Sequence, residues 1–133
     1  MTGLFLQVRI HSTRLPGKAL LPLPGGNVIQ HAMRALKLIP VDIYALLTDE
    51  TSAPALEKSA AGEGFDLFTG PEQDVLQRYL LAAEFYKTGC LIRATGDNPL
   101  VSASLGQEIL QVHRELPSWK SKTKKLWKGN RLL

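Results

Sequence analysis

A short basic loop near the N-terminus holds the residues whose types and spacing best suit chemistry. Residues 4–10 are an apolar run that predicts a first β-strand, and residues 7–18 read QVRIHSTRLPGK. In an open α/β sheet, ligands bind beyond the carboxyl ends of the strands, where this loop would lie. Its cations Arg9, Arg14 and Lys18 suit a nucleoside triphosphate. The backbone N–H groups that could line a concavity for phosphate oxygens surround Ser12, Thr13 and Gly17.

Two familiar phosphate loops do not fit this segment. A Walker A loop needs a glycine five residues before Gly-Lys and a hydroxyl directly after it, but Ser12 and Ala19 occupy these places. The dinucleotide fingerprint needs three close glycines, and this loop has one. A basic, solvated loop that binds nothing is the alternative, because short motifs also arise by chance.

Four ordered segments along the chain carry a family resemblance. They read STRLPGK (12–18), LLPL with GG and IQH (20–31), DVLQRY with AA (74–83), and IRATGDNPL (92–100). Together they resemble the cytidylyltransferases that make CMP-activated sugars, of the spore-coat-polysaccharide type and, more distantly, the acylneuraminate and Kdo (deoxy-manno-octulosonate) types. The resemblance runs from about residue 4 to residue 113, and family members are longer than this chain. It implies a Rossmann-like nucleotidyltransferase fold, of the nucleotide-diphospho-sugar transferase type.

Alternating strand and helix patterns predict the same α/β class, with a mostly parallel sheet and helices on both faces. Expected strands are 4–10, 43–47, 66–68 and 90–94; expected helices are 28–38, 54–63, 73–86 and 104–115. Asn27 is placed to cap the first helix and Pro54 to start the second. The helix over 73–86 has the clearest periodicity, and its repeating positions are Leu76, Tyr79, Leu80, Ala83 and Tyr86.

Composition indicates one small domain. The chain has 133 residues, 44% of them hydrophobic, and no apolar run as long as the ~18 residues of a membrane span. Gln7 and Arg9 interrupt the N-terminal apolar patch, which does not resemble a signal peptide. The one cysteine, Cys90, lies in an apolar run that favours packing, and it fits a reducing compartment. We therefore expect a cytoplasmic protein.

The charge is distributed unevenly. Residues 1–113 hold nine Lys or Arg and eleven Asp or Glu, whereas residues 114–133 hold seven and one. We expect a nucleotide-binding α/β domain over 1–115 and a basic tail over 116–133 that lies outside the family pattern. The tail, with Trp119 and Trp127, could bind RNA or an anionic membrane surface, or be a disordered, charge-rich end. The acidic body argues against nucleic acid as the partner.

The resemblance assigns roles to the loop residues. It implies that Arg14 and Lys18 are catalytic: they hold the β- and γ-phosphates and stabilise departing pyrophosphate. His11 stands where the family usually has a small residue, and it either crowds the loop or contacts a phosphate. The remaining expected nucleotide-binding residues are Gln7, Arg9, Ser12, Thr13, Gly17, Thr48, Asp49, Asp74, Arg78, Arg93 and Thr95.

Asp97 is the candidate ligand for Mg²⁺. It follows a predicted buried strand in a Thr-Gly-Asp-Asn-Pro turn, and Mg²⁺ takes one or two carboxylates together with phosphate oxygens. A plain turn former is the alternative, but the matching Arg93 and Thr95 favour the metal. The family often has a further acidic residue shortly afterwards, whereas residues 101–104 read VSAS. A second carboxylate would come, by resemblance, from a C-terminal half that this chain lacks.

Two further pairs carry weaker signals. Asp74 and Arg78 stand four residues apart on a predicted helix, so they could form a surface ion pair worth about 0.3–0.5 kcal/mol. The resemblance instead places them beside the nucleotide and sugar pocket. Thr48 and Asp49, at the end of the second strand, are candidates for recognising the base or ribose.

The resemblance implies transfer of CMP from CTP to a sugar acid or related sugar, with Mg²⁺ as cofactor and pyrophosphate released, for surface-polysaccharide precursors. The acceptor sugar cannot be read from this part of the family pattern. A truncated, inactive nucleotide-binding module is the main alternative, and RNA or surface binding through the tail is another. A homodimer is one possible assembly, and the sequence does not decide the oligomeric state.

Overall fold

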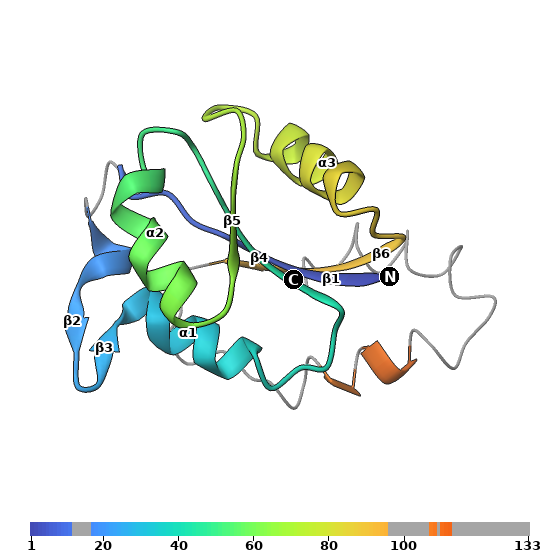
Figure 1. Ribbon diagram of the computed structural model, residues 1–133, viewed down its shortest axis with the longest axis horizontal. Helices are drawn as coiled ribbons and strands as arrows, with labels where there is room; N and C mark the ends of the chain where they lie inside the picture. Colours follow the sequence, from blue (N-terminus) through green and yellow to red (C-terminus); the bar gives the residue numbers. More distant parts are fainter. Residues whose placement is uncertain (12–16, 96–106, 109, 113–133) are drawn as a thin grey trace.

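Four parallel strands form the centre of the protein. A computed structural model describes residues 1–11, 17–95, 107–108 and 110–112 (Figure 1). Among these residues the strands of the main sheet stand in the order β5-β4-β1-β6. Their bounds are β1 Thr2–Gln7, β4 Ile43–Thr48, β5 Asp66–Thr69 and β6 Cys90–Thr95. The α/β class and the parallel sheet expected from the sequence are confirmed.

The register of the sheet brings the carboxyl ends of the central strands together. Gln7 of β1 pairs with Leu47 of β4 and with Thr95 of β6. The strand expected over 4–10 ends earlier, at Gln7. The next residue, Val8, donates one more hydrogen bond to the Leu47 carbonyl (N···O 3.0 Å), and the chain then leaves the sheet. The basic loop therefore starts at this edge of the sheet.

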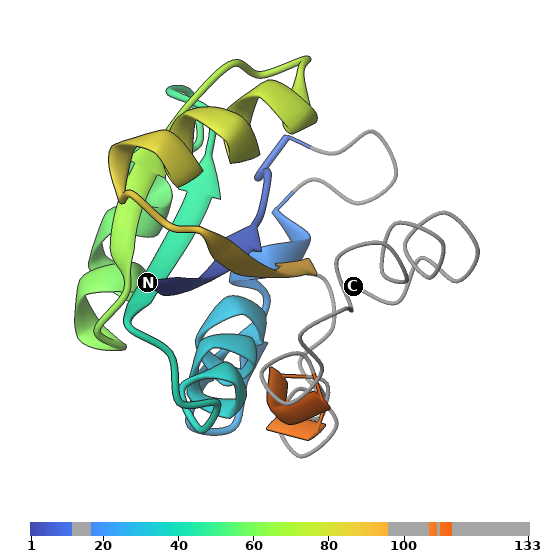
Figure 2. The same cartoon turned by 90° about the vertical axis from the view of Figure 1, so that its right-hand side faces the viewer.

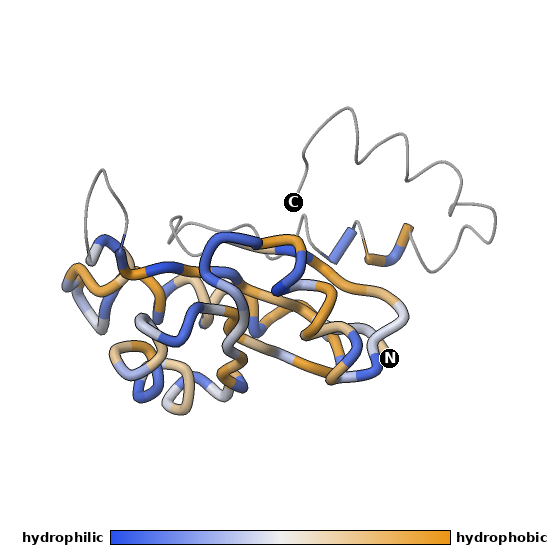
Figure 3. Tube along the Cα trace, turned by 90° about the horizontal axis from the view of Figure 1, so that it is seen from above, coloured by the Kyte–Doolittle hydropathy of each residue, from blue (hydrophilic) through white to orange (hydrophobic). Residues whose placement is uncertain are grey.

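Helices cover both faces of the sheet (Figures 1 and 2). Helices α1 (Val28–Leu36) and α2 (Ala53–Gly62) pack on one face and α3 (Val75–Phe85) on the other. Strand β1 serves both layers, since neighbouring side chains point to opposite faces. Leu4 and Leu6 join the cluster of α1 and α2, whereas Phe5 joins that of α3. Hydrophobic and hydrophilic stretches alternate along the chain accordingly (Figure 3).

Side-chain hydrogen bonds cap the start of α1 and join the helix to the hairpin before it. Asn27 Oδ1 accepts from the Gln30 N–H (2.9 Å), and Gln30 Oε1 accepts from the Asn27 N–H (3.0 Å), so the predicted cap is confirmed. A hairpin of β2 (Pro22–Leu23) and β3 (Gly26–Asn27), and a short 3₁₀ helix η1 (Lys18–Leu20), were not expected. Arg34 Nη1 on α1 secures the hairpin by donating to the Gly25 carbonyl (2.7 Å).

The buried face of α3 matches its periodicity only in part. Tyr79 is buried and Ala83 and Tyr86 pack on the sheet as the spacing suggests, but Leu76 and Leu80 are 70% and 56% exposed. Arg78 and Ala82, outside the predicted set, are buried instead. An arginine takes a core position here because backbone carbonyls surround its guanidinium.

A last helical segment follows β6 in the chain. Residues 107–108 and 110–112 are helical, in agreement with the helix expected over 104–115. Leu110 is 3% exposed and joins the core beneath α1, and Gln107 Nε2 donates to the Leu38 carbonyl (2.7 Å). The basic tail over 116–133 lies outside the described residues, so the proposed division of the chain stays a prediction.

Candidate functional site

A hydrogen bond closes the basic loop at its base. The Gly17 N–H donates to the Ile10 carbonyl (2.9 Å), so the residues on either side of segment 11–16 lie side by side. Gly17 has φ 75° and ψ 13°, a left-handed conformation that glycine adopts at little cost. Ser12, Thr13 and Arg14 belong to the part of the loop outside the described residues, and their predicted contacts stay predictions.

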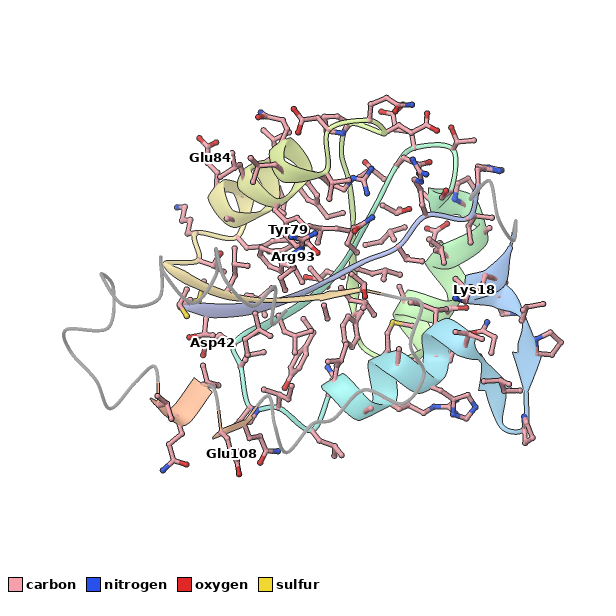
Figure 4. All side chains as sticks on the ribbon, turned by 180° about the vertical axis from the view of Figure 1, so that it is seen from behind. Lys18, Asp42, Tyr79, Glu84, Arg93 and Glu108 are labelled. Carbon is pink, nitrogen blue, oxygen red and sulfur yellow. The ribbon has the colours of Figure 1, made fainter. Side chains whose placement is uncertain are left out.

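Two cations flank the closed loop. Arg9 precedes it and Lys18 follows it as the first residue of η1, and both residues are exposed. Figure 4 marks the position of Lys18. Ala19, the next residue, is buried in the core and fixes η1 against α1. The loop therefore has a positive charge at each end, on a well-anchored base. His11 is also exposed.

A buried carboxylate and hydroxyl lie beside the start of the loop. Asp49, 2% exposed, accepts from the Ser52 N–H (Oδ1, 2.7 Å) and from Ser52 Oγ (Oδ2, 3.1 Å). Ser52 Oγ in turn accepts from the Ile10 N–H (3.1 Å). Sequence reasoning missed Ser52. The available signal was a hydroxyl residue three positions after a strand-end aspartate, at the start of a helix.

The buried side chain of Arg78 holds two backbone carbonyls of the β5–α3 connection. Its Nε and Nη2 donate to the Pro71 carbonyl (3.1 and 2.7 Å), and Nη2 also donates to that of Glu72 (3.0 Å). Within the described residues, Nη1 is buried without a hydrogen-bond partner. Burial lowers the pKa of Arg78, an effect that the negative charge of Asp49 opposes and the positive charge of Arg9 increases.

The surface ion pair between Asp74 and Arg78 is therefore a wrong interpretation. Arg78 is 0% exposed, because its side chain turns inward to the carbonyls of the β5–α3 connection. Asp74 caps α3 instead, with Oδ1 accepting from the Gln77 N–H (2.9 Å). Whether either residue contacts a nucleotide stays a prediction.

Gly70, directly after β5, packs closely against the side chain of Arg78. The Gly70 N–H donates to the Thr48 carbonyl (2.9 Å), which continues the ladder beyond β5. A Cβ atom on Gly70 would lie 2.8 Å from Cγ of Arg78, so the close approach requires glycine. Thr48 is fully buried, and its Oγ1 has no partner among the described residues.

The end of β6 contributes a third group of candidate residues. The Arg93 guanidinium lies 5.1 Å from the centre of the Tyr79 ring, and Figure 4 shows the two side chains together. Tyr79 Oη donates to the Ala94 carbonyl (3.2 Å), and burial raises the pKa of this phenol. Thr95 is exposed at the strand end, level with Gln7 of β1.

The structure thus brings several predicted residues to one edge of the sheet. Those at or next to strand ends are Gln7, Arg9, Thr48, Asp49 and Thr95. The described residues contain no cluster of three or more metal-ligating side chains. This is compatible with Mg²⁺, which is bound by one or two carboxylates plus phosphate oxygens. Asp97 lies outside the described residues.

Comparison with known proteins shows the family of the chain. A family model described as cytidylyltransferase matches residues 4–133. The chain belongs to the cytidylyltransferase family. The resemblance read from the four sequence segments is confirmed, and the match includes the basic C-terminal residues that the sequence patterns set apart.

A curated relative gives the same family at the level of sequence. The chain is 36% identical over 115 residues to the spore coat polysaccharide biosynthesis protein SpsF of Bacillus subtilis. The alignment covers 81% of this chain and 48% of the relative. The chain thus spans about half the length of the curated relatives it matches.

Solved structures confirm the fold. A cytidylyltransferase from Leptospira borgpetersenii has a TM-score of 0.83 at 30% identity, covering 88% of this chain and 50% of that one. A CMP:2-keto-3-deoxy-manno-octonic acid synthetase complexed with CTP has a TM-score of 0.71 at 26% identity, covering 88% and 48%. Rv0371C of Mycobacterium tuberculosis, in complex with manganese, has a TM-score of 0.64 at 22% identity, covering 84% and 58%. In the described part of this chain, no helix has the length and apolar character to cross a membrane.

Proposed function

We propose that this protein binds CTP with Mg²⁺ and transfers CMP to an acidic sugar, releasing pyrophosphate, in the synthesis of surface-polysaccharide precursors. The observation that carries the proposal is the closed loop between Ile10 and Gly17, flanked by Arg9 and Lys18 at the carboxyl edge of a parallel sheet. Family membership supports the nucleotide. The names of the relatives, a polysaccharide biosynthesis protein and a synthetase complexed with CTP, support the pathway and the base.

In the proposed reaction the chain supplies charge and position. An oxygen of the sugar attacks the α-phosphorus of CTP in line. The new O–P bond forms as the bond to the pyrophosphate oxygen breaks, and the hydroxyl proton passes to solvent. Lys18 and Arg14 hold the terminal phosphates and stabilise the charge on departing pyrophosphate. Arg9 adds positive charge at the other end of the loop, and no covalent intermediate is needed.

Asp97 is the proposed carboxylate ligand of Mg²⁺. Bound Mg²⁺ neutralises and orients a triphosphate. Asp97 follows Thr95 by two residues, and Thr95 ends β6 at the edge where the phosphate loop starts. The manganese complex of a protein with this fold supports a divalent ion. Changing Asp97→Asn should abolish most of the Mg²⁺ dependence of CTP binding without lowering the melting temperature, whereas unchanged dependence would make Asp97 a turn residue.

The other predicted contacts belong to the same proposal. The nucleoside would lie towards the ends of β4 and β5, near Thr48, Asp49 and the start of α3 at Asp74. Arg78 would act there by holding the carbonyls of Pro71 and Glu72 in place. We propose that the reaction takes place in the cytoplasm, where CTP is available.

Pyrophosphate release tests the proposed activity. The protein is incubated with CTP, Mg²⁺ and a panel of acidic sugars, and pyrophosphate is measured with an enzyme-coupled assay. Release that depends on both CTP and one sugar, and falls strongly in Lys18→Ala, is the expected result. CTP binding without release from any sugar would identify a nucleotide-binding module. This alternative matters because the chain spans about half the length of its relatives.

A further inference from the structure

The backbone of Ile10 is hydrogen-bonded through both its N–H and its carbonyl. Its N–H donates to Ser52 Oγ (3.1 Å), and its carbonyl accepts from the Gly17 N–H (2.9 Å). The first bond sets the direction in which the chain leaves β1, and the second closes the loop. The two bonds fix the two peptide groups on either side of the Ile10 Cα, and Ser52 is the side chain that holds the first of them.

The Ser52 hydroxyl has its own direction set by Asp49. A hydroxyl has one hydrogen to donate, and here it points to Asp49 Oδ2 (3.1 Å), which leaves the oxygen lone pairs facing Ile10. The Ser52 N–H bonds the other carboxylate oxygen (2.7 Å). Asp49 and Ser52 are 2% and 0% exposed, so water does not compete for these charge-assisted bonds.

The pair is fixed to rigid elements. Asp49 directly follows β4, and Ser52 directly precedes α2. The Ala53 N–H donates to the Asp49 carbonyl (3.1 Å), which ties the first turn of α2 to the strand end. Ile10, where the loop begins, is therefore tied to the packed sheet and helix through the Asp49–Ser52 pair.

We propose that Asp49 and Ser52 are positioning residues that hold the start of the phosphate-binding loop, at Ile10 and its bond to Gly17, in place before the nucleotide arrives. This rests on the proposed function only for the identity of the ligand. A pre-ordered loop binds phosphates without a further entropic cost of ordering. Loss of the pair should therefore weaken binding of CTP, whose β- and γ-phosphates need the loop, much more than binding of CMP.

Ser52→Ala is the direct test, and Ser59→Ala on the same helix is its matched control. Ser59 is also buried, but its hydroxyl accepts only a long bond from Asn27 Nδ2 (3.4 Å). Amide hydrogen exchange of the ligand-free protein is measured by NMR at Ile10 and Gly17, together with the Kd for CTP and CMP. In Ser52→Ala we expect exchange at both amides and the Kd for CTP to rise about tenfold, the effect of one buried hydrogen bond. The Kd for CMP should change less than about twofold.

A conservative replacement and a second variant complete the test. Ser52→Thr keeps the hydroxyl and should retain slow exchange at Ile10. If Ser52→Ala does not fold, Asp49→Asn serves instead, because its amide nitrogen cannot accept from Ser52 Oγ. Exchange at Ile10 and Gly17 should then rise in the same way.

The exchange and affinity readouts separate this inference from the proposed function. If wild type binds CTP, but Ser52→Ala changes exchange and affinity no more than Ser59→Ala, the positioning role is wrong and the proposed function stands. If Ser52→Ala frees both amides while wild type binds no CTP, the pair does hold the loop and the proposed function fails.

Discussion

The buried guanidinium of Arg78 and the carbonyl oxygen of Pro71 are joined by two hydrogen bonds, from Nε at 3.1 Å and from Nη2 at 2.7 Å. This contact makes an arginine of α3 the support of the β5–α3 connection, which lies at the same sheet edge as the phosphate loop. A charged residue thus occupies a buried position on α3, where an apolar residue is usual. Its positive charge interacts with the negative charge of Asp49.

Arg78→Met should lower the free energy of unfolding by about 2–4 kcal/mol, because the carbonyls of Pro71 and Glu72 lose their donors. Arg93→Met is the matched control. It removes an exposed arginine whose described contact is the face of the Tyr79 ring, so it should cost about 1 kcal/mol or less. Urea denaturation of the three proteins measures both values. Equal losses in the two variants would contradict a structural role for the buried guanidinium.

Gly70→Ala should destabilise the protein by about 1–3 kcal/mol, because the new Cβ would lie 2.8 Å from Cγ of Arg78 and 3.3 Å from its Cα. Gly62→Ala is the opposite case. No atom lies within 4 Å of a Cβ at this helical position, and alanine should stabilise α2 by about 0.5–1 kcal/mol. Thermal unfolding compares the two variants, and a shift of the same sign in both would contradict the close approach at Gly70.

Tyr86 should make stability fall at high pH. Burial, together with the negative charge of Asp66, raises the pKa of Tyr86 to about 12 from 10.0. The fold therefore favours the neutral phenol, so this contribution is complete below pH 10 and is lost as the pH rises from 10 towards 12. Melting temperatures of wild type and Tyr86→Phe over this range measure it. The wild type should lose more stability than the variant, and parallel curves would show that Tyr86 does not contribute.

Much of the fold follows from local sequence signals. Alternating apolar segments predict the four strands and three helices, and Asn27 predicts the start of α1, because periodicity and caps depend on neighbours in the chain. The end of β1 is different. Val8 is buried and apolar like a strand residue and still bonds to Leu47, but β1 ends at Gln7, and an apolar pattern does not mark that end.

The candidate site is only partly readable from the sequence, for a physical reason. The loop and its cations form a contiguous motif, so their place at the sheet edge could be predicted. The burial of Arg78 and the contact of Ser52 with Ile10 depend on partners brought together by the fold. The Ser52–Ile10 bond joins residues 42 positions apart, and no local pattern contains it.

Titration calorimetry with CTP and CMP in the presence of Mg²⁺ tests the central claim most directly. Wild type should bind CTP more tightly than CMP, because in the proposed complex the cations of the loop face the terminal phosphates. Lys18→Ala should lose most of that difference, while Lys58→Ala, which removes an exposed lysine on α2, should keep it. Equal affinity of wild type for CTP and CMP, or an unchanged preference in Lys18→Ala, would contradict the assignment of this loop as the triphosphate site.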